Sequence, residues 1–328
     1  MSMQRRGLLA AGLGAAVVAP FCGAAAQTVS YPTRPVRMLI GFPPGGGVDI
    51  IARLLAPRLQ ERLGQPVLVE NRAGANGNIA MDAVVKSPPD GYTLFYGNVG
   101  NLAVTNALYA NLGFDTLRDF VPVAQSMEST LVVAVTDALP VRSLAELIAY
   151  AKANPGRLNA GSAGAGGPSH LALELFKRQT STDIVHVPYR GSAPAVQDLA
   201  GGRVQLLLDG YSLMRGAVES GRVRVLAVAA SERQALLPEV PTTAEAGLPG
   251  FEAGSWHALV APRGSPSAAL ERLEAAMRWA LTETDLPQAF AQQGVSARFR
   301  DAAATRAFIA AERERWTGVV RAAGITAD

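Results

Sequence analysis

Residues 36–70 read VRMLIGFPPGGGVDIIARLLAPRLQERLGQPVLVE, and this stretch contains a strand, a glycine-rich turn, a helix and the start of a second strand. The apolar run at residues 36–40 is typical of a buried strand. After the turn, apolar residues recur on one face of a helix as far as Leu63. Pro43, Pro44 and the three glycines that follow let the backbone turn sharply between strand and helix. The order of these elements predicts an α/β fold.

The turn at residues 42–47, the first glycine-rich loop, also predicts an anion-binding site. Its N–H groups lie at the N-terminus of a helix, where they have no partner within the helix and where the helix dipole is positive. Gly47 is followed by Val48 and Asp49, so neither the NTPase phosphate loop nor the dinucleotide fingerprint fits. Asp49 suits the dipole but would repel a doubly charged phosphate, so a small carboxylate fits better. A tight turn without a ligand remains an alternative.

The first 26 residues have the pattern of a secretory signal peptide. Arg5 and Arg6 precede a short apolar run, and Ala24 to Ala26 supply small residues for cleavage after Ala26. The twin arginine leaves export in a folded state open, and the apolar run is too short for a membrane span. Cleavage would remove Cys22, the only cysteine. We therefore expect an exported protein without disulfides, thiolate metal sites or a cysteine nucleophile.

Composition indicates a well-packed protein. Hydrophobic residues make up 49% of the chain and charged residues 17%, which argues against disorder. Residues 27–328 are enough for one large domain or two ordinary ones. The formal net charge of +3 includes Arg5 and Arg6, and no basic run is interleaved with aromatic residues. We expect neither nucleic-acid binding nor direct membrane insertion.

Further along, strands keep ending in small polar loops. The strand at 93–96 leads to Asn98, and the strand at 158–160 leads to the Gly- and Ser-rich residues 161–170. In this second glycine-rich loop (residues 162–169), Ser169 is expected to cap the next helix. Ser192 opens another helix, and a later strand ends at Asp209. Because the carboxyl ends of strands line the ligand crevice of open α/β sheets, two lobes with a ligand between them are expected.

The remaining chemistry-bearing residues form no catalytic set. His170 and His186 lack metal-ligand spacing, so a packing or capping role is favoured over a base or a ligand. No G-x-S-x-G elbow is present, so the serines are expected to donate hydrogen bonds or cap helices. Arg190 could pair with a carboxylate or be a solvated loop residue. Asp209 could accept a bond from a ligand amino or hydroxyl group, or cap the next turn. No cofactor or metal is expected.

Ordered motifs over nearly all of the mature chain resemble one receptor family. They are residues 42–49 (FPPGGGVD) followed by Ala52-Arg53, 69–74 (VENRAG), 89–94 (PDGYTL), 143–147 (SLAEL), 187–191 (VPYRG), 240–242 (VPT) with 245–247 (EAG), and 261–262 (AP). Together these motifs resemble the signature of Bug-type receptors, the periplasmic substrate-binding proteins of tripartite tricarboxylate transporters.

The resemblance implies an α/β, two-lobed periplasmic-binding-protein fold of type II, with the ligand cleft between lobes joined by two hinge crossings. Residues 27–128 and 254–328 would form the first lobe and residues 129–253 the second, after a signal peptide at 1–26. The hinges are expected near residues 125–131 and 251–256. The receptor would be periplasmic and would not be an enzyme.

The implied ligand is a small organic carboxylate: a di- or tricarboxylate, an amino acid or an aromatic acid. Its inner carboxylate would lie between the first glycine-rich loop, where ordered water helps to bridge, and the second, which donates directly. Asn98, residues 189–192 and Asp209 would help to choose the other end of the ligand. The predicted ligand-binding residues are Phe42, Pro44, Gly45, Gly46, Gly47, Asn98, Ser162, Ala163, Gly164, Gly167, Ser169, Tyr189, Arg190, Gly191, Ser192 and Asp209.

Two positions depart from the family pattern. Pro57 replaces a good helix former and is expected to kink the first helix beyond its anion-binding end. Gly41 replaces a larger residue and is expected to widen the cleft slightly.

The implied partners are the inner-membrane transporter subunits, which such a receptor contacts transiently to deliver its ligand. One alternative is a ligand sensor that presents its closed form to a membrane sensor kinase. Another is a secreted hydrolase or isomerase with His170 or Asp209 as base, for which the sequence offers neither a nucleophile nor a metal partner.

Overall fold

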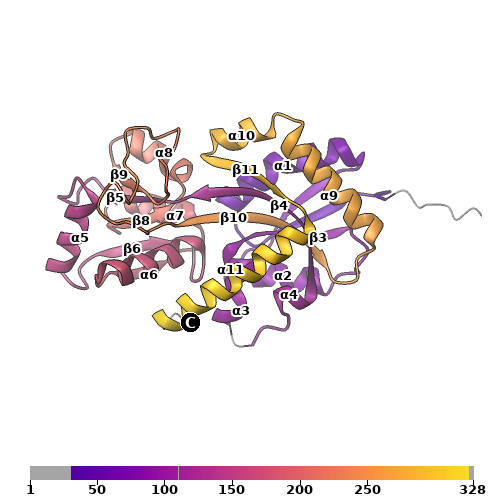
Figure 1. The fold of residues 1–328 in the computed structure, drawn as a ribbon, viewed down its shortest axis with the longest axis horizontal. Coiled ribbons are helices and arrows are strands. Elements are labelled where there is room, and N and C mark those ends of the chain that lie inside the picture. The colour runs from indigo at the N-terminus through magenta and orange to yellow at the C-terminus, as the bar shows by residue number, and fades with distance from the viewer. Residues whose placement is uncertain (1–30, 110, 325–328) are drawn as a thin grey trace, which may run out of the picture. The chain divides into compact units, whose positions relative to one another are not determined.

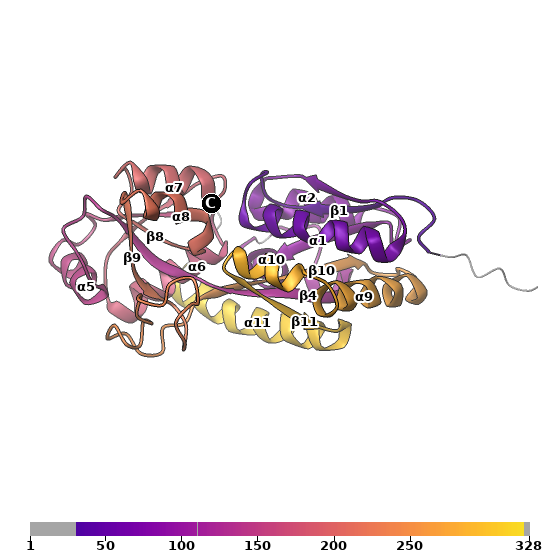
Figure 2. The same cartoon turned by 90° about the horizontal axis from the view of Figure 1, so that it is seen from above.

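The computed structural model describes residues 31–109 and 111–324, so the predicted signal peptide lies outside the described residues. The described part contains two β-sheets with helices packed on both faces of each (Figures 1 and 2). In spatial order, the six-stranded sheet consists of β11 (Val295–Arg300), β4 (Phe120–Thr130), β10 (Gly254–Pro262), β3 (Thr93–Asn98), β1 (Val36–Ile40) and β2 (Val67–Asn71). The five-stranded sheet consists of β7 (Val185–Pro188), β6 (Asn159–Ser162), β8 (Leu206–Asp209), β5 (Val132–Thr136) and β9 (Val223–Val228).

The six-stranded sheet is mixed, as its connections require. β1 pairs in parallel with β2 and β3, because helices carry the chain back between these strands. β10 lies antiparallel between β3 and β4, and β11 pairs antiparallel with β4 at the edge. The carboxyl ends of β1 and β3 therefore lie at the same edge of the sheet, where the loops after them meet.

Side chains alternate between two apolar layers on either side of this sheet. Val36, Met38 and Ile40 pack in one layer with α1 (Gly47–Leu63), α9 (Ser267–Thr282) and α10 (Leu286–Gln292). Leu39 packs in the opposite layer, whose helices are α2 (Asn78–Val85), the π-helical η2 (Gly100–Val104), α3 (Thr105–Leu108) and α11 (Ala302–Ala323). The short helices η1 (Ala75–Gly77) and α4 (Thr116–Asp119) complete this half of the structure.

The five-stranded sheet has the same layered plan. β6 pairs in parallel with β7 and β8, and β5 lies antiparallel between β8 and β9. One face packs against α5 (Leu144–Ala153) and α6 (Pro168–Thr180), with Phe176 at its centre. The other face packs against α7 (Ser192–Ala200) and α8 (Tyr211–Glu219), where Met214 is fully buried.

Two chain segments connect the sheets. β4 continues through Leu131 into β5, and the chain returns through Ala253 into β10. The Leu131 N–H donates to the Ala253 carbonyl at 2.9 Å, so the two crossings are hydrogen-bonded to each other. Figure 1 shows β4 and β10 running side by side toward the second sheet. The two-lobed α/β fold is thereby confirmed, while the lobe boundaries at 128/129 and 253/254 and the hinge role of the crossings stay predictions.

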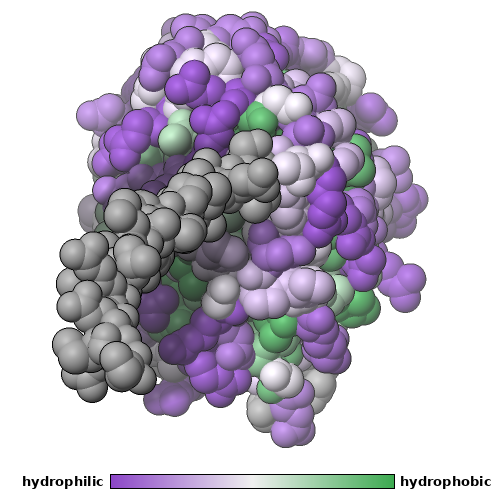
Figure 3. Space-filling model, turned by 90° about the vertical axis from the view of Figure 1, so that its right-hand side faces the viewer, coloured by the Kyte–Doolittle hydropathy of each residue, from purple (hydrophilic) through white to green (hydrophobic). Residues whose placement is uncertain are grey.

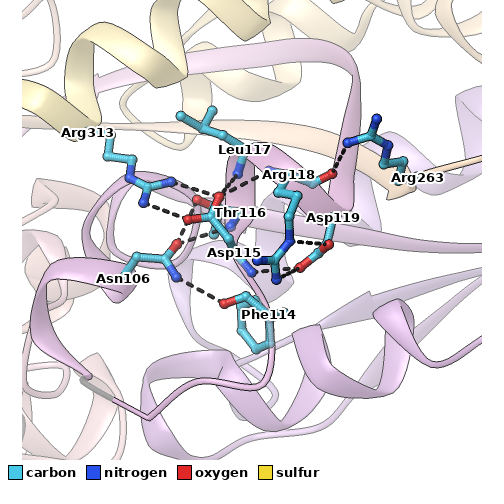
Figure 4. A network of polar contacts seen from close by, with 9 residues as sticks. All are labelled: Asn106, Phe114, Asp115, Thr116, Leu117, Arg118, Asp119, Arg263 and Arg313. Atoms are coloured by element: carbon cyan, nitrogen blue, oxygen red, sulfur yellow. Dashed lines mark hydrogen bonds and ion pairs between the residues drawn. The ribbon is translucent and has the colours of Figure 1, made fainter.

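A polar network ties α11 to the loop before β4 (Figure 4). The Asp115 carboxylate caps α4 by accepting the N–H groups of Leu117 and Arg118. Both of its oxygens also accept the Arg313 guanidinium, at 2.9 and 2.7 Å. The bonds from Arg313, with smaller contributions from the backbone, lower the pKa of Asp115 to about 2.

The two departures from the family pattern lie away from the cleft. α1 continues past Pro57 to Leu63. The expectation that Gly41 widens the cleft is wrong, because Gly41 does not line the cavity described below. A Cβ at this position would lie 2.3 Å from the Gly77 Cα, so glycine permits two loops to touch.

The surface drawn in Figure 3 is mainly hydrophilic, with separate apolar spots rather than one continuous apolar face. Leu68 and Ile79 are among the few large apolar side chains of the described residues that are exposed. Within residues 31–109 and 111–324, no helix combines the length and apolar character that crossing a membrane requires.

Candidate functional site: a cavity between the two lobes

A cavity of about 190 Å³ lies where the carboxyl ends of strands from both sheets face each other. This volume is below the roughly 300–1,000 Å³ of drug-sized sites, so it suits a small metabolite. The predicted residues that line it are Phe42, Pro44, Gly46, Gly47, Asn98, Ala163, Gly167, Ser169, Arg190, Gly191, Ser192 and Asp209. Both glycine-rich loops and the strand-end residues are thus brought together by the fold.

Four helix N-termini meet at this cavity. The helices are α1, α6, α7 and α8, and their N-cap residues are Gly46, Gly167, Gly191 and Gly210, all of which line the cavity. Because each N-cap is a glycine, no N-cap side chain accepts a first-turn N–H of these four helices, although the Gly210 N–H itself donates to the Asp209 carboxylate. Side-chain caps are present on α4, α5 and α11, but α2, α3, α9 and α10 also lack them, so what distinguishes the four helices is that their N-termini meet at the cavity. The positive dipole ends of the four helices and their unpaired first-turn N–H groups are therefore left for an anion. Pro168 and Pro194 supply no N–H, and the Leu213 N–H is bonded to the Gly210 carbonyl.

The sequence predicted the starts of α1, α6 and α7, but only the first two as anion-binding sites, and it assigned the caps differently. Ser169 is not the cap of α6, because Gly167 is the N-cap and Pro168 occupies the first turn. Instead, the Ser169 hydroxyl accepts the Ala163 N–H at 3.0 Å and closes the second glycine-rich loop. Ser192 does open α7 as predicted, but its N-cap is Gly191.

Asp49 holds the first glycine-rich loop from inside. This carboxylate is 3% exposed and accepts bonds from the Gly45 N–H, the Arg53 Nε and the Asn71 amide, each at 2.9 Å. The Asn71 amide also donates to the Phe42 carbonyl at 3.0 Å. Burial by itself raises the pKa of Asp49, but the three bonds together hold it below its ordinary value. Its charge is compensated by Arg53, so the repulsion of phosphate that the sequence suggested is weaker than expected.

The second glycine-rich loop uses most of its own donors. The N–H groups of Gly164, Gly166 and Gly167 bond to Ser162 Oγ, His170 Nδ1 and the Gly164 carbonyl, respectively. The direct donors expected from this loop are therefore largely occupied. What remains for a ligand is the first turn of α6.

Four predicted residues do not line the cavity but support its walls. Gly45 gives its N–H to Asp49, and Gly164 gives its N–H to Ser162. Ser162 is fully buried, with its hydroxyl 2.6 Å from His186 Nε2. The Tyr189 hydroxyl donates to Asp198 at 2.7 Å.

Arg190 and Asp209 are the predicted charged residues of the lining. The Asp209 carboxylate accepts the Ser192 hydroxyl and the Gly210 N–H, both at 2.8 Å, and burial raises its pKa. Asp209 therefore bonds to the start of the turn after it and also lines the cavity. The structure is consistent with both roles expected for it, capping that turn and accepting a bond from a ligand. Arg190 is exposed, and none of the ion pairs among the described residues involves it. It is available to a ligand anion.

The two histidines of the second lobe have the packing role that was predicted. The rings of His170 and His186 stack at 3.8 Å with 7° between their planes. Burial, the largest cause for both, lowers the pKa of each to about 4, so both rings are neutral at neutral pH. In the part of the chain that the structure describes, no cluster of three His, Cys, Asp or Glu residues could hold a metal.

Sequence reasoning missed the part of the lining that comes from β4, β10 and α8. These residues include Met127, Ser129, Ser255, His257 and Ser212. The signal for α8 was present, since a strand ending at Asp209 is followed by Gly210 and a helix, the same order as at Gly46 and Gly167. The crossing strands gave no comparable sign, because their cleft-facing residues are ordinary Ser, Met and His.

Comparison with known proteins agrees with this geometry. Residues 51–325 match the tripartite tricarboxylate transporter family receptor, TctC. Protein BugT of Bordetella pertussis is 40% identical over 99% of both chains. A Rhodopseudomonas palustris protein solved with adipate, Rpa4515, is 38% identical with a TM-score of 0.86, over 90% of this chain and 99% of that one. MatC from the same organism, solved with malate, is 34% identical with a TM-score of 0.83, over 88% and 100%.

These similarities confirm the Bug-type resemblance and the prediction of a receptor rather than an enzyme. The family model covers most of the chain, and the alignment with BugT also includes the first glycine-rich loop. The chain belongs to the tripartite tricarboxylate transporter receptor family and is a solute receptor with the two-lobed periplasmic-binding-protein fold.

Proposed function

We propose that this receptor is exported to the periplasm, where its cavity binds a small organic carboxylate for uptake by a tripartite tricarboxylate transporter. Removal of residues 1–26 would leave the mature protein, and the transporter's membrane subunits would be its transient partners. The single observation that carries the proposal is the meeting of four uncapped helix N-termini at one cavity.

The physical argument concerns the charge that such a site accepts. Each helix end supplies unpaired N–H donors and about half a positive charge, and these are fixed before the ligand arrives. Closure of the lobes would exclude water and strengthen each hydrogen bond. The helix ends come from both lobes, so an anion between them would favour the closed form.

Dicarboxylates are the first candidates. α1 lies on one lobe and α6, α7 and α8 on the other, so the cavity can serve two carboxylates at separate ends. Two similar receptors were solved with the dicarboxylates adipate and malate. The free Arg190 guanidinium adds one cation at the second lobe, suited to bidentate carboxylate binding.

A thermal-shift screen of the exported protein against small carboxylates and their amides tests this proposal. A ligand at a hundred times its dissociation constant stabilises the native state by about 2.7 kcal/mol, which raises the unfolding midpoint. We expect carboxylates, and not their amides, to produce this shift. A response only to sugars or metals would contradict the proposal.

Gly46→Val tests the first glycine-rich loop directly. The backbone of Gly46 is extended, and a Cβ there would meet only the Pro43 carbonyl at 3.5 Å, so the variant should fold. Its methyl groups would occupy the space in front of the first turn of α1, and binding should be lost. The matched control is Gly318→Val on α11, where a Cβ meets open space. Wild-type affinity in Gly46→Val would remove this loop from the site.

The alternative of a ligand sensor differs from the transport proposal only in the membrane protein that the closed receptor would contact. Uptake of the identified carboxylate by membranes carrying the transporter's subunits, dependent on added receptor, would support transport. No observation on the described residues favours a sensor kinase.

A further inference from the structure

Two rows of side chains across four neighbouring strands form one wall of the cavity. In the first row, Asn98 of β3 pairs with His257 of β10, which pairs with Met127 of β4. In the second row, Ser255 of β10 pairs with Ser129 of β4, which pairs with Val295 of β11. All six residues line the cavity, and we call them the floor. Paired residues of adjacent strands lie on one face of the sheet, so the floor is a continuous surface.

Two polar atoms of the floor have no partner. The Ser255 hydroxyl and the His257 Nδ1 are buried and make no hydrogen bond among the described residues. An unpaired buried polar atom costs about 1–3 kcal/mol, and native proteins rarely keep one without a reason. Trp256, between them, faces the other way and donates its Nε1 hydrogen to Glu312 at 2.9 Å. β10 therefore satisfies the polar group on its other face but leaves these two, on the face that lines the cavity, without a partner.

The imidazole of His257 is held in a fixed position. A bulge in β4 places Ser126 opposite the His257–Ala258 step, and its hydroxyl donates to the His257 carbonyl at 3.2 Å. The same hydroxyl is 2.6 Å from the Tyr96 hydroxyl, and the Tyr96 ring meets the imidazole edge-on at 5.4 Å. Phenylalanine would pack against Tyr96 equally well and leave no unpaired nitrogen. Packing therefore explains why a ring is present at position 257, but not why that ring carries nitrogens.

The floor carries no ionised group. Burial lowers the pKa of His257 to about 3, so its ring is neutral and offers one donor and one acceptor. The Asn98 Oδ1 accepts the N–H groups of Gly100 and Asn101, which leaves its amide hydrogens as spare donors. A carboxylate is better served by the helix N-termini. A neutral group that both donates and accepts, a hydroxyl, fits the floor.

We propose that the floor is a hydroxyl-recognition subsite, in which His257 and Ser255 select a hydroxylated carboxylate over the same acid without the hydroxyl. This inference rests on the proposed carboxylate function and names the ligand class within it. A site built to bond a hydroxyl discriminates strongly against an analogue that lacks it, because its polar groups are then left unpaired. We expect at least tenfold tighter binding of the hydroxylated acid.

Calorimetric titration with matched pairs tests the subsite. The probes are succinate with malate, glutarate with 2-hydroxyglutarate, and adipate with 2-hydroxyadipate. We expect the wild-type protein to prefer the hydroxylated member of at least one pair tenfold or more. Ser255→Ala and His257→Phe should each lose that preference through weaker binding of the hydroxylated acid. The affinity for the acid without the hydroxyl should change less than twofold. His257→Asn, which restores a polar group, should recover part of the preference.

The matched control is Ser296→Ala, because Ser296 points away from the floor on β11 and is exposed. It should bind every probe as the wild type does. Carboxylate binding without any hydroxyl preference, or an unchanged preference in both Ser255→Ala and His257→Phe, would overturn the subsite and leave the proposed function standing. No binding of any carboxylate by the wild-type protein would overturn both.

Discussion

Replacing Asp49 by alanine should damage both stability and binding, although Asp49 itself does not line the cavity. The carboxylate is the common acceptor for the Gly45 N–H, the Asn71 amide and the Arg53 guanidinium. Its removal leaves two partly buried donors without an acceptor and frees the turn in front of α1.

The size of the effect follows from those three bonds. Bonds to a charged acceptor contribute about 1.5–3 kcal/mol each, but the Arg53 side chain is 51% exposed and can be hydrated instead. Counting only the Gly45 and Asn71 donors, each at the lower end of this range because both are partly buried, gives a loss of about 3 kcal/mol in the free energy of unfolding. Carboxylate affinity should fall as well, since the first turn of α1 is no longer held in place.

Urea unfolding and calorimetric titration measure the two effects. The control is Asp82→Ala, which removes an exposed pair with Lys86 on α2 and should change the free energy of unfolding by less than about 0.5 kcal/mol. Because the pKa of Asp49 is lowered, its stabilising contribution is present above the ordinary carboxyl pKa and is lost as pH falls below it. An Asp49→Ala protein as stable as the control, with wild-type affinity, would refute the reasoning.

Three further perturbations follow from the structure. Asp115→Ala removes the cap of α4 and the partner of Arg313. Urea titration should show a loss of at least the roughly 0.5–2 kcal/mol of unfolding free energy that is typical of a lost cap. An unchanged unfolding free energy would contradict the role of this network. Gly41→Ala should cost about 1–3 kcal/mol through the clash of its Cβ with the neighbouring loop, and a neutral effect on the thermal midpoint would contradict that contact. The unfolded chain protonates His170 and His186 near pH 6.5 whereas the folded one resists until about pH 4, so stability should fall over that interval. Replacing His170 by phenylalanine should reduce this fall in urea midpoints, and an unchanged pH profile would contradict it.

Local pattern was enough to predict the strand–loop–helix units. The glycine-rich loop after β1 and the Ser- and Gly-rich loop after β6 carry short-range signals, and each is found where it was expected. Of the predicted site residues, most line one cavity because loops at the carboxyl ends of strands gather at one edge of a sheet.

The crossing strands were harder to predict. β4 contains Pro122 and the buried polar residues Gln125 and Ser126, so it lacks the apolar run of a typical strand. The Gln125 N–H donates to the Thr305 hydroxyl on α11, and the Gln125 side chain accepts a bond from Arg300 on β11. No local window of sequence shows these long-range partners. β11 was missed even though its apolar residues alternate strictly, from Val295 to Phe299.

The floor of the cavity could not have been found from the sequence. His257 and Ser255 gain their meaning only from the register of β10 with β4 and β3 and from the bulge at Ser126. Likewise, the internal bonds of the second glycine-rich loop, with Ser169 turned back to Ala163, depend on the fold. Strand register and hydrogen bonds between residues far apart in the sequence are tertiary properties, and residue type alone does not fix them.

The most direct test of the account is a crystal structure of the receptor with the carboxylate that stabilises it most. We predict a carboxylate group in the cavity with its oxygens within hydrogen-bond distance of first-turn N–H groups of α1 and of at least one of α6, α7 and α8. A ligand bound outside this cavity, or one whose carboxylate contacts only side chains and leaves these N–H groups to water, would contradict the account.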